Sequence, residues 1–177
     1  MRLLVILAFV IAAIPAAAQD MPARKAGLWD MKMTFEGRNT PPQVMQHCID
    51  ATTDKAMQDM SGGTQAQNCS KRETKKVSGT IVFDSVCNFG TGTTTSHGVV
   101  SGDFNSAYTI KINSKREGGP AIPHMPAETQ MTIEAKWAGP CKTNQKPGDI
   151  IMANGMKMNV TDMQKGAPPG APGGMKK

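Results

Sequence analysis

The stretch Gly27-Leu28-Trp29-Asp30-Met31-Lys32-Met33-Thr34-Phe35-Glu36-Gly37 decides the fold of this chain. Apolar side chains occupy every second position of it, at Trp29, Met31, Met33 and Phe35, whereas the alternate positions are polar or charged apart from one leucine. A period of two residues is typical of a β-strand with one buried face and one face in water. The globular part of the chain is therefore predicted to begin with an amphipathic strand.

Alternation of the same kind recurs further along the chain. Residues 128–137 alternate apolar side chains, including Met131 and Trp137, with polar ones, and residues 104–113 do the same around Tyr108. Further strands are predicted over residues 43–49, 68–77, 80–88 and 93–101.

One short helix is predicted over residues 53–60. Thr52 or Thr53 can act as its N-cap, and Asp54 in its first turn suits the helix dipole. The run Ser61-Gly62-Gly63 is expected to end it.

About seven strands, short turns and one short helix predict an all-β protein with an antiparallel meander. Because one face of such a sheet is apolar, the sheet must curl over its own core or pack on a second sheet. We expect a strongly curved sheet or incomplete barrel, with a two-sheet β-sandwich as the alternative. The predicted core or ligand-facing side chains are Trp29, Met31, Met33, Phe35, Tyr108, Met131 and Trp137.

The first 18 residues have the features of an export signal. Met1-Arg2 provides a positive charge, the run from Leu3 to Pro15 is apolar, and Ala16-Ala17-Ala18 suits a signal peptidase. A signal peptide over residues 1–18 and a periplasmic or secreted location are therefore predicted. No later stretch of the sequence reaches the roughly 20 apolar residues of a transmembrane helix.

The end of the chain lacks a clear pattern. Residues 142–164 contain a mixed apolar segment in which Gly155 argues against one continuous helix, so an irregular extension is expected there. Residues 165–177 are rich in proline, glycine and alanine and are expected to form a disordered tail.

Cys48, Cys69, Cys87 and Cys141 are an even set in a chain that is predicted to be exported, so disulfides are expected. Of the three possible pairings we favour Cys48 with Cys69, which closes a local excursion, and Cys87 with Cys141, which joins a middle strand to the last one. The absence of a C-x-x-C spacing argues against a zinc site or a redox motif.

Several short motifs occur in a fixed order along the chain. Lys25-Ala26-Gly27-Leu28-Trp29-Asp30 opens the series, Gln46-His47-Cys48-Ile49 precedes the short helix, and Trp137-Ala138-Gly139-Pro140-Cys141 closes it. With Cys69 and the hairpin over Val77–Cys87 between them, these motifs resemble those of the domain of unknown function 3617 family of exported bacterial proteins. The resemblance covers a β-domain over about residues 24–141 and implies export, an all-β fold and structural cysteines. It supplies no activity and no catalytic or ligand residues.

Motifs for catalysis are missing from the sequence, which has no G-x-S-x-G, no H-E-x-x-H and no glycine-rich phosphate loop. We expect a protein that is not an enzyme and has no cofactor, with a hydrolytic enzyme as the least favoured alternative. The first hypothesis is a binding or envelope-associated module that holds a small hydrophobic ligand or lipid in its curved sheet.

The 14 methionines suggest a second hypothesis. Thioethers in Met31-Lys32-Met33 and at Met152, Met156 and Met158 suit Cu(I) outside the cytoplasm. Methionine is also a common core filler, which is the simpler interpretation for Met31 and Met33 beside Trp29.

The formal net charge is +6, and the densest basic cluster comprises Lys71, Arg72, Lys75 and Lys76. No aromatic residues alternate with these charges, so nucleic acid is not expected as a partner. An exposed edge strand, on which lysines discourage edge-to-edge pairing, is the favoured interpretation.

Overall fold

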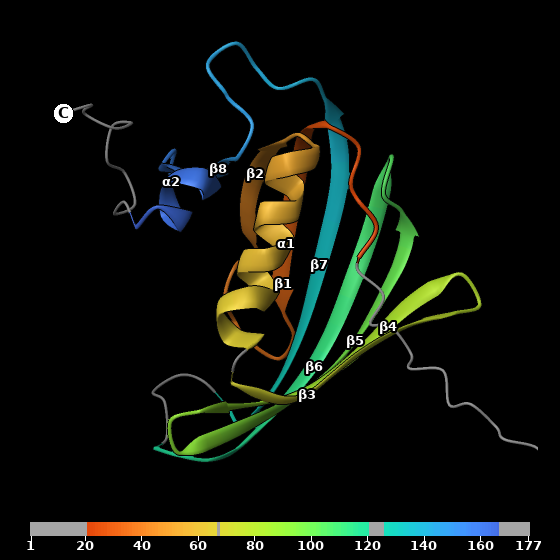
Figure 1. The fold of residues 1–177 in the computed structure, drawn as a ribbon, viewed down its shortest axis with the longest axis vertical. Coiled ribbons are helices and arrows are strands. Elements are labelled where there is room, and N and C mark those ends of the chain that lie inside the picture. Colours follow the sequence, from red (N-terminus) through yellow and green to blue (C-terminus); the bar gives the residue numbers. More distant parts are fainter. Residues whose placement is uncertain (1–20, 67, 121–125, 167–177) are drawn as a thin grey trace, which may run out of the picture.

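The computed structural model describes residues 21–66, 68–120 and 126–166 and shows one antiparallel sheet that curves strongly but does not close (Figure 1). Within these residues, nine strands follow the order β3-β4-β5-β6-β7-β1-β2-β8-β9 across the sheet. The strands are β1 (Gly27–Phe35), β2 (Gln43–Ile49), β3 (Cys69–Val77), β4 (Thr80–Phe89), β5 (Gly92–Asp103), β6 (Ala107–Gly118), β7 (Glu128–Gly139), β8 (Asp149–Met152) and β9 (Lys157–Asn159), and the helices are α1 (Ala51–Ala66) and α2 (Val160–Gln164). The predicted curved, incomplete sheet is confirmed, and the two-sheet sandwich is wrong because the strands form one hydrogen-bonded sheet.

Strand β1 lies inside the sheet, between β7 and β2. Trp29 is directly opposite Trp137 of β7 on one side and His47 of β2 on the other. Strands β3 to β7 follow one another as neighbours, and the last of them pairs with β1. The opening stretch of the domain therefore joins this meander to the strands β2, β8 and β9.

Helix α1 lies on the concave side of the sheet, which we call the inner face (Figure 1). Met57 of the helix belongs to the same buried cluster as Trp29, whose side chain is 0% exposed. The ring centroids of Trp29 and Tyr108 are 5.5 Å apart. The full buried cluster comprises Trp29, Ile49, Met57, Ile81, Val100, Tyr108, Ala135 and Val160.

Helix α1 begins earlier and ends later than the predicted range 53–60. Asp50, rather than Thr52 or Thr53, precedes its first residue. The Oδ1 atom of Asp50 accepts a hydrogen bond from the backbone N of Thr53 at 2.8 Å, and Thr53 Oγ1 accepts one from the backbone N of Asp50 at 3.0 Å. This is the reciprocal pattern of a capping box, and it holds the pKa of Asp50 below its usual value. Gly62-Gly63 does not end the helix, since each glycine weakens a helix by only about 1 kcal/mol.

The segment 142–164 is not the irregular extension that we expected. It contains β8 and β9, which extend the sheet beyond β2, and the short helix α2. Asp149 is 1% exposed and accepts hydrogen bonds from Asn159 Nδ2 at 2.9 Å and from the backbone N of Lys146 at 3.0 Å. The sequence pattern missed these strands because they are only four and three residues long, too short to show a period of two.

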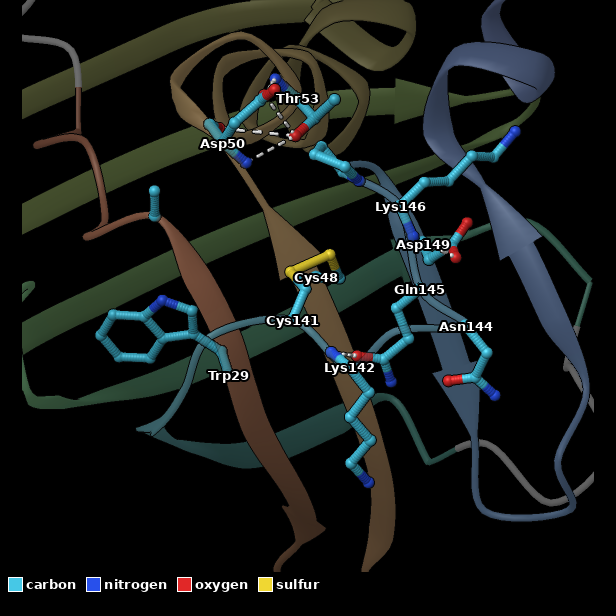
Figure 2. The surroundings of a disulfide bond; sticks show 12 residues. Trp29, Cys48, Asp50, Thr53, Cys141, Lys142, Asn144, Gln145, Lys146 and Asp149 are labelled. Atoms are coloured by element: carbon cyan, nitrogen blue, oxygen red, sulfur yellow. Dashed lines mark hydrogen bonds between the residues drawn. A yellow bond between two sulfur atoms is a disulfide. The ribbon is translucent and has the colours of Figure 1, made fainter.

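One disulfide joins Cys48 to Cys141 (Figure 2). The other joins Cys69 to Cys87, so the predicted pairing is wrong. Cys69 and Cys87 are opposite each other on β3 and β4. Cys48 lies on β2 and Cys141 follows β7, and only β1 separates these two strands. The pairing follows from which strands are neighbours, which alternation along a single strand does not reveal.

Two predictions fall on residues that the structure does not describe. The predicted signal peptide over residues 1–18 lies outside the described ranges, as do residues 167–177 of the predicted tail. The helices that are described are too short or too polar to cross a membrane.

Candidate functional site

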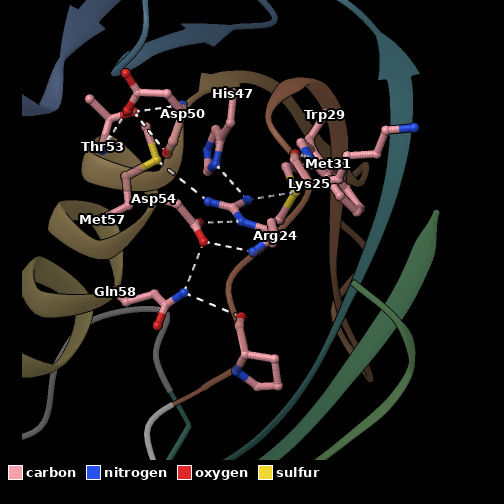
Figure 3. A network of polar contacts seen from close by, with 11 residues as sticks. Arg24, Lys25, Trp29, Met31, His47, Asp50, Thr53, Asp54, Met57 and Gln58 are labelled. Atoms are coloured by element: carbon pink, nitrogen blue, oxygen red, sulfur yellow. Dashed lines mark hydrogen bonds and ion pairs between the residues drawn. The ribbon is translucent and has the colours of Figure 1, made fainter. Parts of the chain in front are cut away.

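A buried ion pair lies between the sheet and α1 on the inner face (Figure 3). The Nε atom of Arg24 is 2.7 Å from Oδ1 of Asp54, and the backbone N of Arg24 donates to Oδ2 of the same carboxylate at 2.8 Å. The Arg24 side chain is 7% exposed and the Asp54 side chain 0% exposed. The pair connects the segment that precedes β1 to helix α1. Because both side chains are buried, loss of either partner would leave a buried charge without its counter-ion and would lower the stability of the fold.

The outer nitrogens of the Arg24 guanidinium face soft or neutral acceptors (Figure 3). Nη1 lies 3.4 Å from Nδ1 of His47 and 4.0 Å from Sδ of Met31, and Nη2 lies 3.6 Å from Sδ of Met57. The guanidinium carbon is 6.0 Å from the centroid of the Trp29 ring. One side chain thus links β1, β2 and α1.

His47 is held neutral by this environment. Burial and, to a smaller extent, the charge of Arg24 lower the pKa of His47 to about 4. Because a guanidinium only donates, Nδ1 accepts the contact from Arg24 and the ring proton is on Nε2. That Nε2 atom is buried and has no hydrogen-bond partner among the described residues.

Beyond the buried cluster, the inner face carries six apolar side chains in two rows across β1, β7 and β6. Met33, Ile133 and Ile110 are opposite one another in the first row. The second row consists of Phe35, Met131 and Ile112. All six are half-buried, and we call this surface the apolar trough.

The outer face of the sheet has an open groove of about 830 Å³ over β1, β2, β6, β7 and β8. Lys32 and Glu134 form an ion pair across it at 3.0 Å, and Gln46 donates to Asp30 at 2.7 Å. These pairs already satisfy much of the polar lining.

The motif at residues 25–30 is explained by contacts at the start of β1. The indole Nε1 of Trp29 donates to the backbone O of Lys25 at 2.8 Å, and that of Trp137 donates to the backbone O of Ala26 at 3.1 Å. Gly27 has a φ of +128°, and a Cβ there would lie 2.4 Å from the backbone O of Gly139 and 2.7 Å from Trp137 Nε1. The motif serves packing and backbone geometry.

A family model described as "Protein of unknown function (DUF3617)" matches residues 24–141, from the buried arginine to the last cysteine. The chain belongs to the DUF3617 family. No curated protein and no solved structure matches the chain. Membership accounts for the ordered motifs of this DUF3617 chain and assigns no activity to it.

Gly27→Ala is expected to lower the free energy of unfolding of this DUF3617 chain by about 3 kcal/mol, because backbone strain and a steric clash add. Gly139→Ala is the matched control, since Gly139 has a similar φ of +125° but no atom within 4 Å of an added Cβ. Strain alone should then cost about 1–2 kcal/mol. Urea unfolding of both variants measures the difference, and equal losses would show that the clash is relieved at no cost.

The predicted site residues fall into two groups on one face. Trp29 and Tyr108 belong to the buried cluster, and Met31 and Trp137 pack against it. The others, Met33, Phe35 and Met131, lie in the apolar trough. Their role as ligand-facing residues stays a prediction.

Sequence reasoning missed the polar centre of the inner face. In the sequence, Arg24 belongs to no predicted element, Asp54 is assigned only to the helix dipole, and His47 is only part of a motif. Arg24 and Asp54 are 30 positions apart, and no spacing rule connects them. Among the described residues, no three His, Cys, Asp or Glu side chains gather as a metal site.

The basic cluster lies on the edge strand β3, as the charge pattern predicted. Glu73 is 3.0 Å from Nζ of Lys75 and 3.7 Å from Nζ of Lys71. The hydrogen bond from Lys75, followed by the charge of Lys71, lowers the pKa of Glu73. Part of the positive charge is therefore compensated within the strand itself.

Proposed function

We propose that this protein is a non-enzymatic binding module that holds a small hydrophobic molecule or lipid in the apolar trough, outside the cytoplasm. Two disulfides support an oxidising compartment. The observation that carries the proposal is the pair of aligned rows, in which six neighbouring apolar side chains on a concave face all keep part of their surface exposed.

The trough continues into further apolar surface. The second row extends from Ile112 through Gly98 of β5 to Phe83 of β4, whose ring lies over the glycine. Removal of apolar surface from water gains about 25 cal/mol per Å², so a ligand that covers such a surface is stabilised without specific polar contacts. Methionines adapt to ligands of different shape because they have three rotatable bonds.

Native mass spectrometry of protein from its native compartment, together with fluorescence titration with N-phenyl-1-naphthylamine, tests the proposal. We expect a bound small molecule or lipid and saturable uptake of the dye. Met131→Gln preserves the side-chain length but places an amide in the trough, and it should weaken dye binding about tenfold, since an amide costs about 1–2 kcal/mol to bury without a partner.

Thr132→Gln is the matched control, because the adjacent residue of β7 points to the outer face. It should bind the dye as the wild type does. Met33→Gln, in the other row, repeats the test if Met131→Gln does not fold by circular dichroism. Ligand-free protein with no dye uptake, or equal binding by the inner-face and outer-face variants, would contradict the proposal.

A further inference from the structure

Three methionines lie side by side on the inner face, on three adjacent strands. Met31 of β1 is directly opposite Met45 of β2, and Met45 is directly opposite Met152 of β8. We call Met31, Met45 and Met152 the methionine row. Directly opposite residues have Cβ atoms about 4.5–5.5 Å apart and point to the same side of the sheet. Each of the three residues is half-buried.

We propose that the methionine row binds one Cu(I) ion. Thioethers are soft, neutral donors that favour Cu(I) over zinc, calcium or magnesium. The long, unbranched methionine side chain lets three sulfurs from neighbouring strands converge on one ion without movement of the backbone. A monovalent ion also suits a neutral donor set, because a divalent ion would leave twice the charge uncompensated at a half-buried site.

The groups around the methionine row leave little net positive charge to repel the single positive charge of a Cu(I) ion. The carboxylate of Asp54 neutralises the guanidinium of Arg24, with Oδ1 2.7 Å from Nε. The sulfur of Met31 already faces a cation, since it lies 4.0 Å from Nη1 of Arg24.

This site differs from the cluster around Met156 and Met158 that the sequence suggested. Met156 is 44% exposed, between β8 and β9, and Met158 is opposite Ile150 rather than in the row. It also goes beyond the proposed function, because the ligand is a metal ion and none of the three side chains belongs to the apolar trough.

Anaerobic titration of the purified protein with Cu(I), in competition with bicinchoninate, tests the proposal. The wild type should retain one Cu(I). Met45→Leu, which removes the central sulfur and nearly keeps the volume, should weaken retention at least tenfold. The labelled methyl signals of Met31, Met45 and Met152 should shift together when Ag(I), a redox-inert analogue, is added.

Met156→Leu is the matched control and should retain Cu(I) as the wild type does. Met152→Leu replaces Met45→Leu if that variant does not fold. Any of three results would overturn the proposal: no Cu(I) retained by the wild type, retention by the row variant equal to the wild type, or a loss that follows Met156→Leu instead.

Discussion

Arg24→Met is expected to lower the free energy of unfolding by about 3–5 kcal/mol, because it leaves a buried carboxylate without its counter-ion. Asp54 is 0% exposed, so water does not take the place of the lost guanidinium at its present position. Gln58 Nε2 still donates to Oδ2 of Asp54 at 3.1 Å, but a neutral amide does not replace a guanidinium. Urea unfolding followed by circular dichroism measures the loss.

The double variant Arg24→Met/Asp54→Asn separates charge burial from packing. It should be more stable than Arg24→Met alone, because the remaining amide is neutral and can still accept the hydrogen bond from the backbone N of residue 24. The exposed pair of Lys55 and Asp59, at 3.3 Å, provides the control, and Lys55→Met should change stability by about 0.5 kcal/mol or less. A loss below about 1 kcal/mol for Arg24→Met would contradict the structural role given to the pair.

Removal of the disulfide between Cys48 and Cys141 is expected to cost more than removal of the one between Cys69 and Cys87. The first bridge spans 93 positions and the second spans 18. Loop-closure entropy then predicts losses of about 4.5 and about 3 kcal/mol for the two paired Cys→Ala variants. Denaturant unfolding of both variants under the same oxidising conditions gives the order.

Peptide mapping without reduction checks the pairing independently of stability. It should recover one linked peptide pair that contains Cys48 and Cys141 and a second that contains Cys69 and Cys87. The reverse order of stability would show that strain or residual structure outweighs loop length. Any other linked pair would contradict the strand order on which the argument depends.

Much of the fold could be predicted because its strands are locally amphipathic. The alternation over residues 27–37 and 128–137 depends only on which side chains point to one face, and that is a property of the extended backbone itself. The short strands β8 and β9 carry too little pattern for this reasoning, and they were missed.

The candidate sites depended on contacts that no local pattern contains. The sequence by itself determined that Met31, Met33 and Trp29 share one face of one strand, because side chains alternate along any strand. Only the tertiary structure decided that β1 lies between β7 and β2, and this order sets which residues stand beside them. It aligns the methionine row, builds the apolar trough, brings Arg24 to Asp54 and pairs Cys48 with Cys141. Which strands become neighbours depends on packing between segments that are far apart in the sequence. The alternation of side chains within one strand contains no information about it.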